Sequence, residues 1–147
     1  MIEDYDLELT ANPGTGQAVT ATGTGYGAKP YEIGVGNDPA VGEPLQALVQ
    51  FPQSFNNMTN ITVDLIADDD GLGTNAVVIA TTGAIALANA NVARGMFRLG
   101  SIASPGAINK RYLTARHVVT GTAPTQGRYR VLLQTGADVV PVNAGAL

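Results

Sequence analysis

The stretch LQALVQF at residues 45–51 decides the fold, because it alternates apolar and polar side chains. Apolar residues stand at every second position from 45 to 51, and Gln46 and Gln50 lie between them. Successive side chains of a strand point to opposite faces, so this pattern buries one face and leaves the other in water. The same period recurs in ITVDL at 61–65 and in RYRVLLQ at 128–134. All three segments predict half-buried strands.

Less regular alternation predicts further strands, which brings the expected number to seven or eight. The eighteen glycines and eight prolines fall mainly between the strands, where turns need a positive or a fixed φ. Segment 84–93, AIALANANVA, is expected to be extended or a single short turn. Residues 11–44, rich in Gly, Thr and Pro, are expected to form ordered loops. The less regular strands are predicted at 17–22, 76–81, 94–99 and 111–119.

These patterns predict an all-β protein, a jelly-roll-like antiparallel β-sandwich with long Gly/Pro-rich loops. The length of 147 residues fits a single domain, 1–147, in which residues 1–16 are expected to form an N-terminal arm. The chain has no cysteine, which excludes disulfides, thiolate catalysis and cysteine-bound zinc. The acidic opening MIEDYDLELT is unlike a signal peptide, and no apolar run is long enough to span a membrane. We therefore expect a soluble chain with no membrane partner.

The charge is unevenly distributed along the chain. The net charge of −4 argues against a nucleic-acid partner. Residues 1–75 hold eleven acids and one base, whereas residues 76–147 hold one acid and seven bases. The two halves could be complementary within the fold or between subunits, or the basic half could face an acidic partner. Alternatively, interleaved strands would average the asymmetry out in space.

The segment IADDDGLGTN at 66–75 has the composition of a calcium loop. With Gly71 at the sixth position of an EF-hand, Ile66 stands where an aspartate is needed and Val77 where a bidentate glutamate is needed. We therefore expect a solvated turn between strands and no metal. A looser site that uses Asp68, Asp70 and backbone carbonyls is the alternative.

The search for catalytic groups finds no motif. The single histidine, His117, falls on the apolar alternation of segment 111–119, which favours a hydrogen-bonded histidine at the edge of the core. No GxSxG, GxxxxGK[ST] or zinc-binding pattern occurs. We expect no enzyme activity and no cofactor. A glycan-binding module is the better rival, with Tyr26 and Tyr31 as the only plausible stacking pair, since Tyr112 and Tyr129 fall inside strand patterns.

The order of several segments is similar to that of a known family. KRYLTARHVVTGTAPTQGRYRVLLQ at 110–134 resembles the C-terminal region of the capsid cement, or decoration, proteins of tailed phages. IGVGNDPAVGEPLQALVQF at 33–51 resembles the entry of that family into a core strand, although NDPAV stands between the glycines. FNNMTNITVDLIADDDG at 55–71 resembles its next strand and acidic turn, and QAVTAT at 17–22 resembles an earlier strand. The resemblance covers nearly the whole chain and is weakest at 23–32 and after 136.

The resemblance implies a jelly-roll-like sandwich that binds the outside of an icosahedral head as a homo-oligomer, either a dimer or a trimer. Its partner would be the major capsid protein of the HK97-type fold, and its location the outer surface of the virion after synthesis in the host cytoplasm. No metal role comes with the acidic turn. A glycan-binding β-sandwich module of a virion surface or fibre is the alternative function.

Two groups of residues are candidates for contact with the capsid or with another subunit. Apolar residues of the acidic N-terminus have too few neighbours in sequence to form a core of their own, so they are expected to pack on another subunit. Arginines spaced by an even number of residues are expected to project from one face of extended strands toward carboxylates of the capsid protein. The candidates are Ile2, Tyr5, Leu7 and Leu9, and Arg94, Arg98, Arg128 and Arg130.

Overall fold

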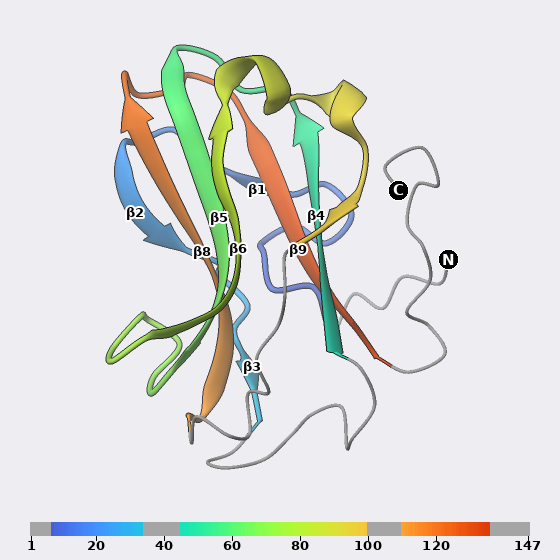
Figure 1. Cartoon of the computed structure of the whole chain (residues 1–147), viewed down its shortest axis with the longest axis vertical. Helices are drawn as coiled ribbons and strands as arrows, with labels where there is room; N and C mark the ends of the chain where they lie inside the picture. The colour runs from blue at the N-terminus through green and yellow to red at the C-terminus, as the bar shows by residue number, and fades with distance from the viewer. Residues whose placement is uncertain (1–6, 34–44, 100–109, 136–147) are drawn as a thin grey trace.

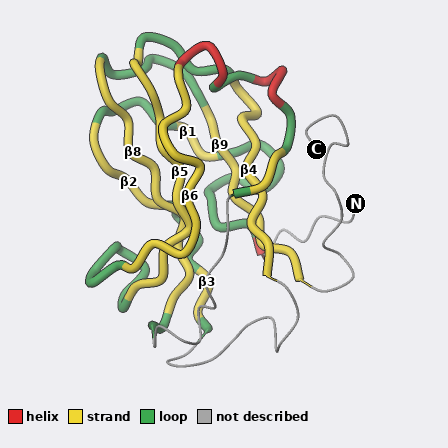
Figure 2. Tube along the Cα trace, in the orientation of Figure 1, coloured by secondary structure: helices red, strands yellow, loops and turns green. Residues whose placement is uncertain are grey.

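The computed structural model describes residues 7–33, 45–99 and 110–135 of the chain. Two antiparallel sheets pack face to face (Figures 1 and 2). Sheet A contains, in spatial order, β1 (Gln17–Ala18), β9 (Arg128–Thr135), β4 (Leu45–Gln53) and β7 (Phe97–Arg98). Sheet B contains β2 (Gly23–Tyr26), β8 (Tyr112–Gly121), β5 (Met58–Asp68) and β6 (Val77–Ala86), with β3 (Tyr31–Glu32) also paired to β8.

The strand order is that of a jelly roll. If β2 and β3 are counted as one interrupted strand, the first strand pairs with the last, the second with the second-last, and so on inward. The pairs are therefore β1 with β9, β2 and β3 with β8, β4 with β7, and β5 with β6. This is a long hairpin rolled into two sheets. The predicted all-β, jelly-roll-like sandwich is confirmed.

The three regular alternations predicted three of the four inner strands of the two sheets. Ala47, Val49 and Phe51 of β4 face the core, as do Ile61, Val63 and Leu65 of β5 and Tyr129, Val131 and Leu133 of β9. A continuous core between the sheets follows, because both inner faces are apolar. Of the less regular segments, those at 76–81 and 111–119 fall in the long strands β6 and β8, whereas the strand expected at 17–22 is only β1 and the one at 94–99 is only β7.

The connection after β6 is made of short turns. β6 continues to Ala86, and the 3-10 helices η2 (Leu87–Asn89) and η3 (Val92–Arg94) follow it. The expectation for 84–93 was therefore correct in kind, although a second turn begins at Val92. Within residues 11–44, the part up to residue 33 holds three short strands between its loops, and residues 34–44 lie outside the described part of the chain.

Candidate protein-docking surface

Four ion pairs join the acidic first half of the chain to the basic second half. Each pairs a carboxylate from before residue 76 with a base from after it, so the charge asymmetry is partly resolved inside the fold. Among the described residues, this leaves Arg94, Arg98 and Arg128 as the arginines that make no ion pair. The pairs are Lys110–Asp69 at 3.2 Å, Arg111–Glu32 at 2.7 Å, Arg116–Asp64 at 2.6 Å and Arg130–Glu8 at 2.9 Å.

Arg130 lies on the polar face of the last strand, as predicted, but it is buried there and does not project into solvent. Its Nε and Nη2 donate to the two carboxylate oxygens of Glu8 at 2.9 and 3.2 Å, and its Nη1 donates to Gln50 Oε1 at 2.7 Å. The Arg130 residue is 3% exposed and Glu8 is 0% exposed. The alternation does turn Arg130 away from the core, but Glu8 and its neighbours cover that face of β9. Arg130 therefore has a structural role within its own chain.

Arg128 is half-buried and also faces its own chain. Its Nη1 donates to the backbone carbonyl of Gly16 at 2.9 Å, and its Cβ lies close to the same glycine. Arg128 thus helps to hold the segment before β1 against β9. It has no carboxylate partner, but only part of its side chain faces water.

Arg94 and Arg98 are exposed, on the segment that ends at the edge strand β7. They do not share one strand face, so that part of the prediction was wrong: Arg94 ends η3, whereas Arg98 lies in β7. The guanidinium carbon of Arg94 lies 4.2 Å from the centroid of the Phe97 ring, a cation–π contact. Arg98 pairs with Leu48 of β4, which lies outside the core cluster, so Arg98 projects from the outer face of sheet A.

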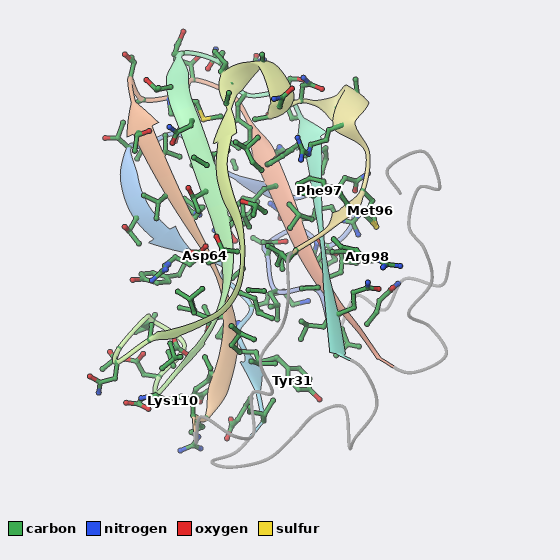
Figure 3. The ribbon with its side chains drawn as sticks, in the orientation of Figure 1. Tyr31, Asp64, Met96, Phe97, Arg98 and Lys110 are labelled. Carbon is green, nitrogen blue, oxygen red and sulfur yellow. The ribbon has the colours of Figure 1, made fainter. Side chains whose placement is uncertain are left out.

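Apolar side chains accompany these two arginines. Phe97 packs partly against the core, with its ring centroid 6.0 Å from that of Phe51. Met96 is half-buried, and Val92 is 56% exposed. Figure 3 shows Met96, Phe97 and Arg98 together along one edge of the sandwich. We call residues 92–98 the η3–β7 surface. Arginine, methionine and aromatic residues are the types enriched in protein interfaces.

The N-terminal segment packs on its own subunit wherever the structure describes it. Leu9 is fully buried in the core cluster, and Leu7 packs against that cluster. The Leu9 N–H donates to Val131 O at 2.8 Å, and Leu9 O accepts the Lys29 N–H at 3.2 Å, so this residue joins the edges of the two sheets. The prediction that Leu9 contacts another subunit was therefore wrong, whereas Leu7 is half-buried and its contact with another subunit stays a prediction. Ile2 and Tyr5 lie outside the described residues.

The acidic loop is held by its own backbone. Asp68 is buried, and its carboxylate accepts the N–H of Gly71 at 3.2 Å, the N–H of Gly73 at 2.7 Å and the Thr114 hydroxyl at 3.0 Å. Hydrogen bonds from Asn75 and then Lys110 lower the pKa of Asp69. The carboxylates thus act as acceptors within the turn. In the described residues, no group of three or more His, Asp or Glu side chains could hold a metal ion.

Asp70 is the exposed carboxylate of the same loop. It accepts the Leu72 N–H at 2.8 Å, the Thr74 hydroxyl at 2.6 Å and the Thr74 N–H at 3.3 Å. The hydrogen bond from the Thr74 side chain is the main reason why the pKa of Asp70 is lowered. Each of the three adjacent aspartates therefore has a partner within the protein.

His117 is a core residue, as the alternation predicted. Its Nδ1 and the Tyr129 hydroxyl are hydrogen-bonded at 2.9 Å, and because His117 belongs to β8 and Tyr129 to β9, this bond links the two sheets across the core. Burial lowers the pKa of His117 to about 4 and raises the pKa of Tyr129. The imidazole is therefore neutral at pH 7, and its position suits a structural role.

Tyr26 and Tyr31 do not form a stacking pair for a sugar. Tyr26 pairs with Arg116 on the outer face of sheet B, whereas Tyr31 pairs with Leu113, which faces the core. Directly paired residues of antiparallel strands project to the same face, so the two rings lie on opposite sides of the sheet. This arrangement removes the sequence feature that favoured a glycan-binding module.

Sequence reasoning missed Glu8, the residue that explains Arg130. The two are 122 positions apart, and no local pattern in the sequence predicts such a contact.

Neither the known protein families nor the curated proteins contain a match to this chain. No helix among the described residues is long and apolar enough to cross a membrane. The η3–β7 surface is the candidate that remains for contact with a partner.

Proposed function

We propose that this protein is a structural virion protein that binds the outside of an icosahedral phage head and cements its lattice of major capsid protein. The observation that carries the proposal is the ordered resemblance to capsid cement proteins, strongest at 110–134 and extending over nearly the whole chain. The jelly-roll sandwich agrees with the fold that the resemblance implies. The protein would act as a homo-oligomer on the outer capsid surface, without catalysis, cofactor, nucleic acid or membrane.

The η3–β7 surface supplies the contact chemistry that this function needs. Arg94 and Arg98 are exposed cations that make no ion pair with another described residue, and they lie beside the partly exposed Met96. An arginine can form two parallel hydrogen bonds to one carboxylate, and such a pair contributes more once the interface excludes water. We therefore assign the shell contact to these two arginines, and the partner surface is acidic.

The experiment replaces Arg94 and Arg98 singly with glutamine and measures rebinding to expanded heads that lack the protein, over a range of salt. The matched control is Arg111→Gln, because Arg111 is equally exposed but already pairs with Glu32 in its own chain. Each test variant is expected to bind about 5- to 100-fold more weakly at low salt, with a smaller loss at high salt, because screening suppresses charge pairs.

Two results would contradict this assignment. One is unchanged rebinding of both test variants with an intact fold. The other is an equal loss in Arg111→Gln, which would indicate a general effect of net charge. A loss that does not depend on salt would also remove the charge-pair explanation, because a contact between exposed ions weakens as ionic strength rises.

A further inference from the structure

The outer face of sheet B carries small, uncharged side chains at the end where β5 begins and where β6 and β8 end. Thr62 and Val118 project outward, because their strand neighbours Ile61, Val63 and Val119 lie in the core. Their row crosses four strands, and a second row lies beside it. We call these two rows the platform. They consist of Thr24, Val118, Thr62 and Ala84, and of Thr120, Asn60 and Ala86. Every one of these side chains is small and neutral.

The next row of the same face is electrically balanced. It runs from Tyr26 through Arg116 and Asp64 to Thr81. Arg116 Nε and Nη2 donate to Asp64 Oδ2 at 3.0 and 2.6 Å, so the two charges neutralise each other. An approaching surface therefore meets no net charge on the platform or on its border, although the whole chain carries −4.

The acidic loop rises from the other end of this face and presents a leucine. Asp68 fixes the backbone of Gly71 and Gly73. Gly71 lies against Pro30, and Gly73 lies against the ring of Tyr26. Leu72 stands between the two glycines and is 72% exposed. The loop lies at the lower left of Figure 1, between β5 and β6. Asp68 and Asp70 thus hold the backbone from which the exposed Leu72 side chain projects.

A second apolar residue lies on the same side of the sheet. Val78 pairs with Ile66 of β5, which lies outside the core cluster, and Val78 is 46% exposed. A loop whose backbone is already held by hydrogen bonds loses little conformational entropy when its apolar side chain is buried in an interface. Interface anchors have this property. The lower end of the face therefore carries the anchor, and the upper end carries a flat surface without bulky side chains.

We propose that a second copy of this chain docks face to face on the outer face of sheet B, with Leu72 of each copy packed on the platform of the other. A twofold axis brings the same patch of both copies together. When the anchor and the platform lie on one face, the contact between the anchor of one copy and the platform of the other therefore forms twice. Two identical charged faces would repel, whereas this face is neutral or internally paired. The inference names the surface of the homo-oligomer in the proposed function, and the free protein tests it without heads.

The experiment measures the association of the purified chain by sedimentation velocity over a range of concentrations. Leu72→Ser removes the anchor, Ala84→Lys places a charge on the platform, and Val92→Ser is the control with a similarly exposed apolar residue outside this face. The wild type and the control are expected to form dimers. The Leu72 and Ala84 variants are expected to dissociate about 100-fold more readily, because each contact occurs twice. Their circular dichroism spectra and melting temperatures should stay near those of the wild type.

A disulfide test supplies the geometry. The chain has no cysteine, so a variant with both Leu72→Cys and Ala84→Cys should link into covalent dimers on oxidation, whereas Leu72→Cys with Val92→Cys should not. A monomeric wild type would overturn the proposal. A dimer that persists in both the Leu72→Ser and the Ala84→Lys variants would also overturn it. A trimer would overturn it as well, because the proposed contact has twofold symmetry. Failure of the head-binding proposal shows instead in the Arg94 and Arg98 variants.

Discussion

Replacement of Arg130 by glutamine should destabilise the protein, because it breaks a buried ion pair. The Glu8 carboxylate is 0% exposed. It would lose both Arg130 bonds, and its remaining partners among the described residues would be the Gly14 N–H at 3.0 Å and the Thr10 hydroxyl at 3.4 Å. A buried charge left without its partner costs about 3–5 kcal/mol. For a chain of this length, the melting temperature should fall by roughly 6–20 °C, at about 2–4 °C per kcal/mol.

The assay is urea unfolding followed by circular dichroism, with Arg111→Gln as the matched control. Arg111 and Glu32 approach to 2.7 Å, but their side chains are 52% and 51% exposed, so this pair should contribute at most about 1 kcal/mol. Replacing both Glu8 and Arg130 by leucine and methionine should recover much of the loss, since no charge then remains buried. The reasoning fails if Arg130→Gln costs less than about 1 kcal/mol, or if the control costs as much.

Three further predictions concern the core and the acidic loop. The free energy of unfolding should fall from about pH 6.5 toward pH 4, by at most about 1.4 kcal/mol per pH unit. In this range the histidine of the unfolded chain takes up a proton, whereas His117 in the folded protein does not, because burial lowers its pKa to about 4. The same slope in the His117→Gln variant would contradict this prediction. Gly25→Ala should cost about 1–3 kcal/mol, because the added Cβ would meet the His117 ring, and an unchanged melting temperature would refute the contact. EDTA and millimolar calcium should give the same melting temperature, since Asp68, Asp69 and Asp70 already have partners in the protein; a rise of several degrees with calcium would reveal a metal site.

The sequence predicted the sandwich because long strands carry a strong periodic signal. Segments 45–51, 61–65 and 128–134 alternate, and they form β4, β5 and β9, three of the four inner strands. The edge strands β1 and β7 are two residues long, which is too short for a period to show. Their pairing is decided by the neighbouring strands and by turns, so the sequence placed them within broader segments.

The docking residues were harder to predict, because alternation gives the face of a strand but not what covers it. Arg128 and Arg130 do point away from the core, but Arg128 bonds to the Gly16 carbonyl and Arg130 bonds to Glu8 and Gln50. Arg94 and Arg98 have the spacing of a strand, yet Arg94 ends the 3-10 turn η3 and only Arg98 lies in a strand. In the sequence, Leu72 looked like part of a polar turn. The bonds that Asp68 accepts from the backbone of Gly71 and Gly73 show that the backbone around Leu72 is held in place.

The most direct test of the central claim is whether the protein binds and stabilises phage heads. Purified protein is mixed with expanded heads that lack it, bound protein is counted after sedimentation, and the temperature at which the shell releases its DNA is measured with and without the protein. We expect saturable binding to the outer surface and a higher release temperature. Heads that neither bind the protein nor gain thermal stability from it would contradict the proposed function.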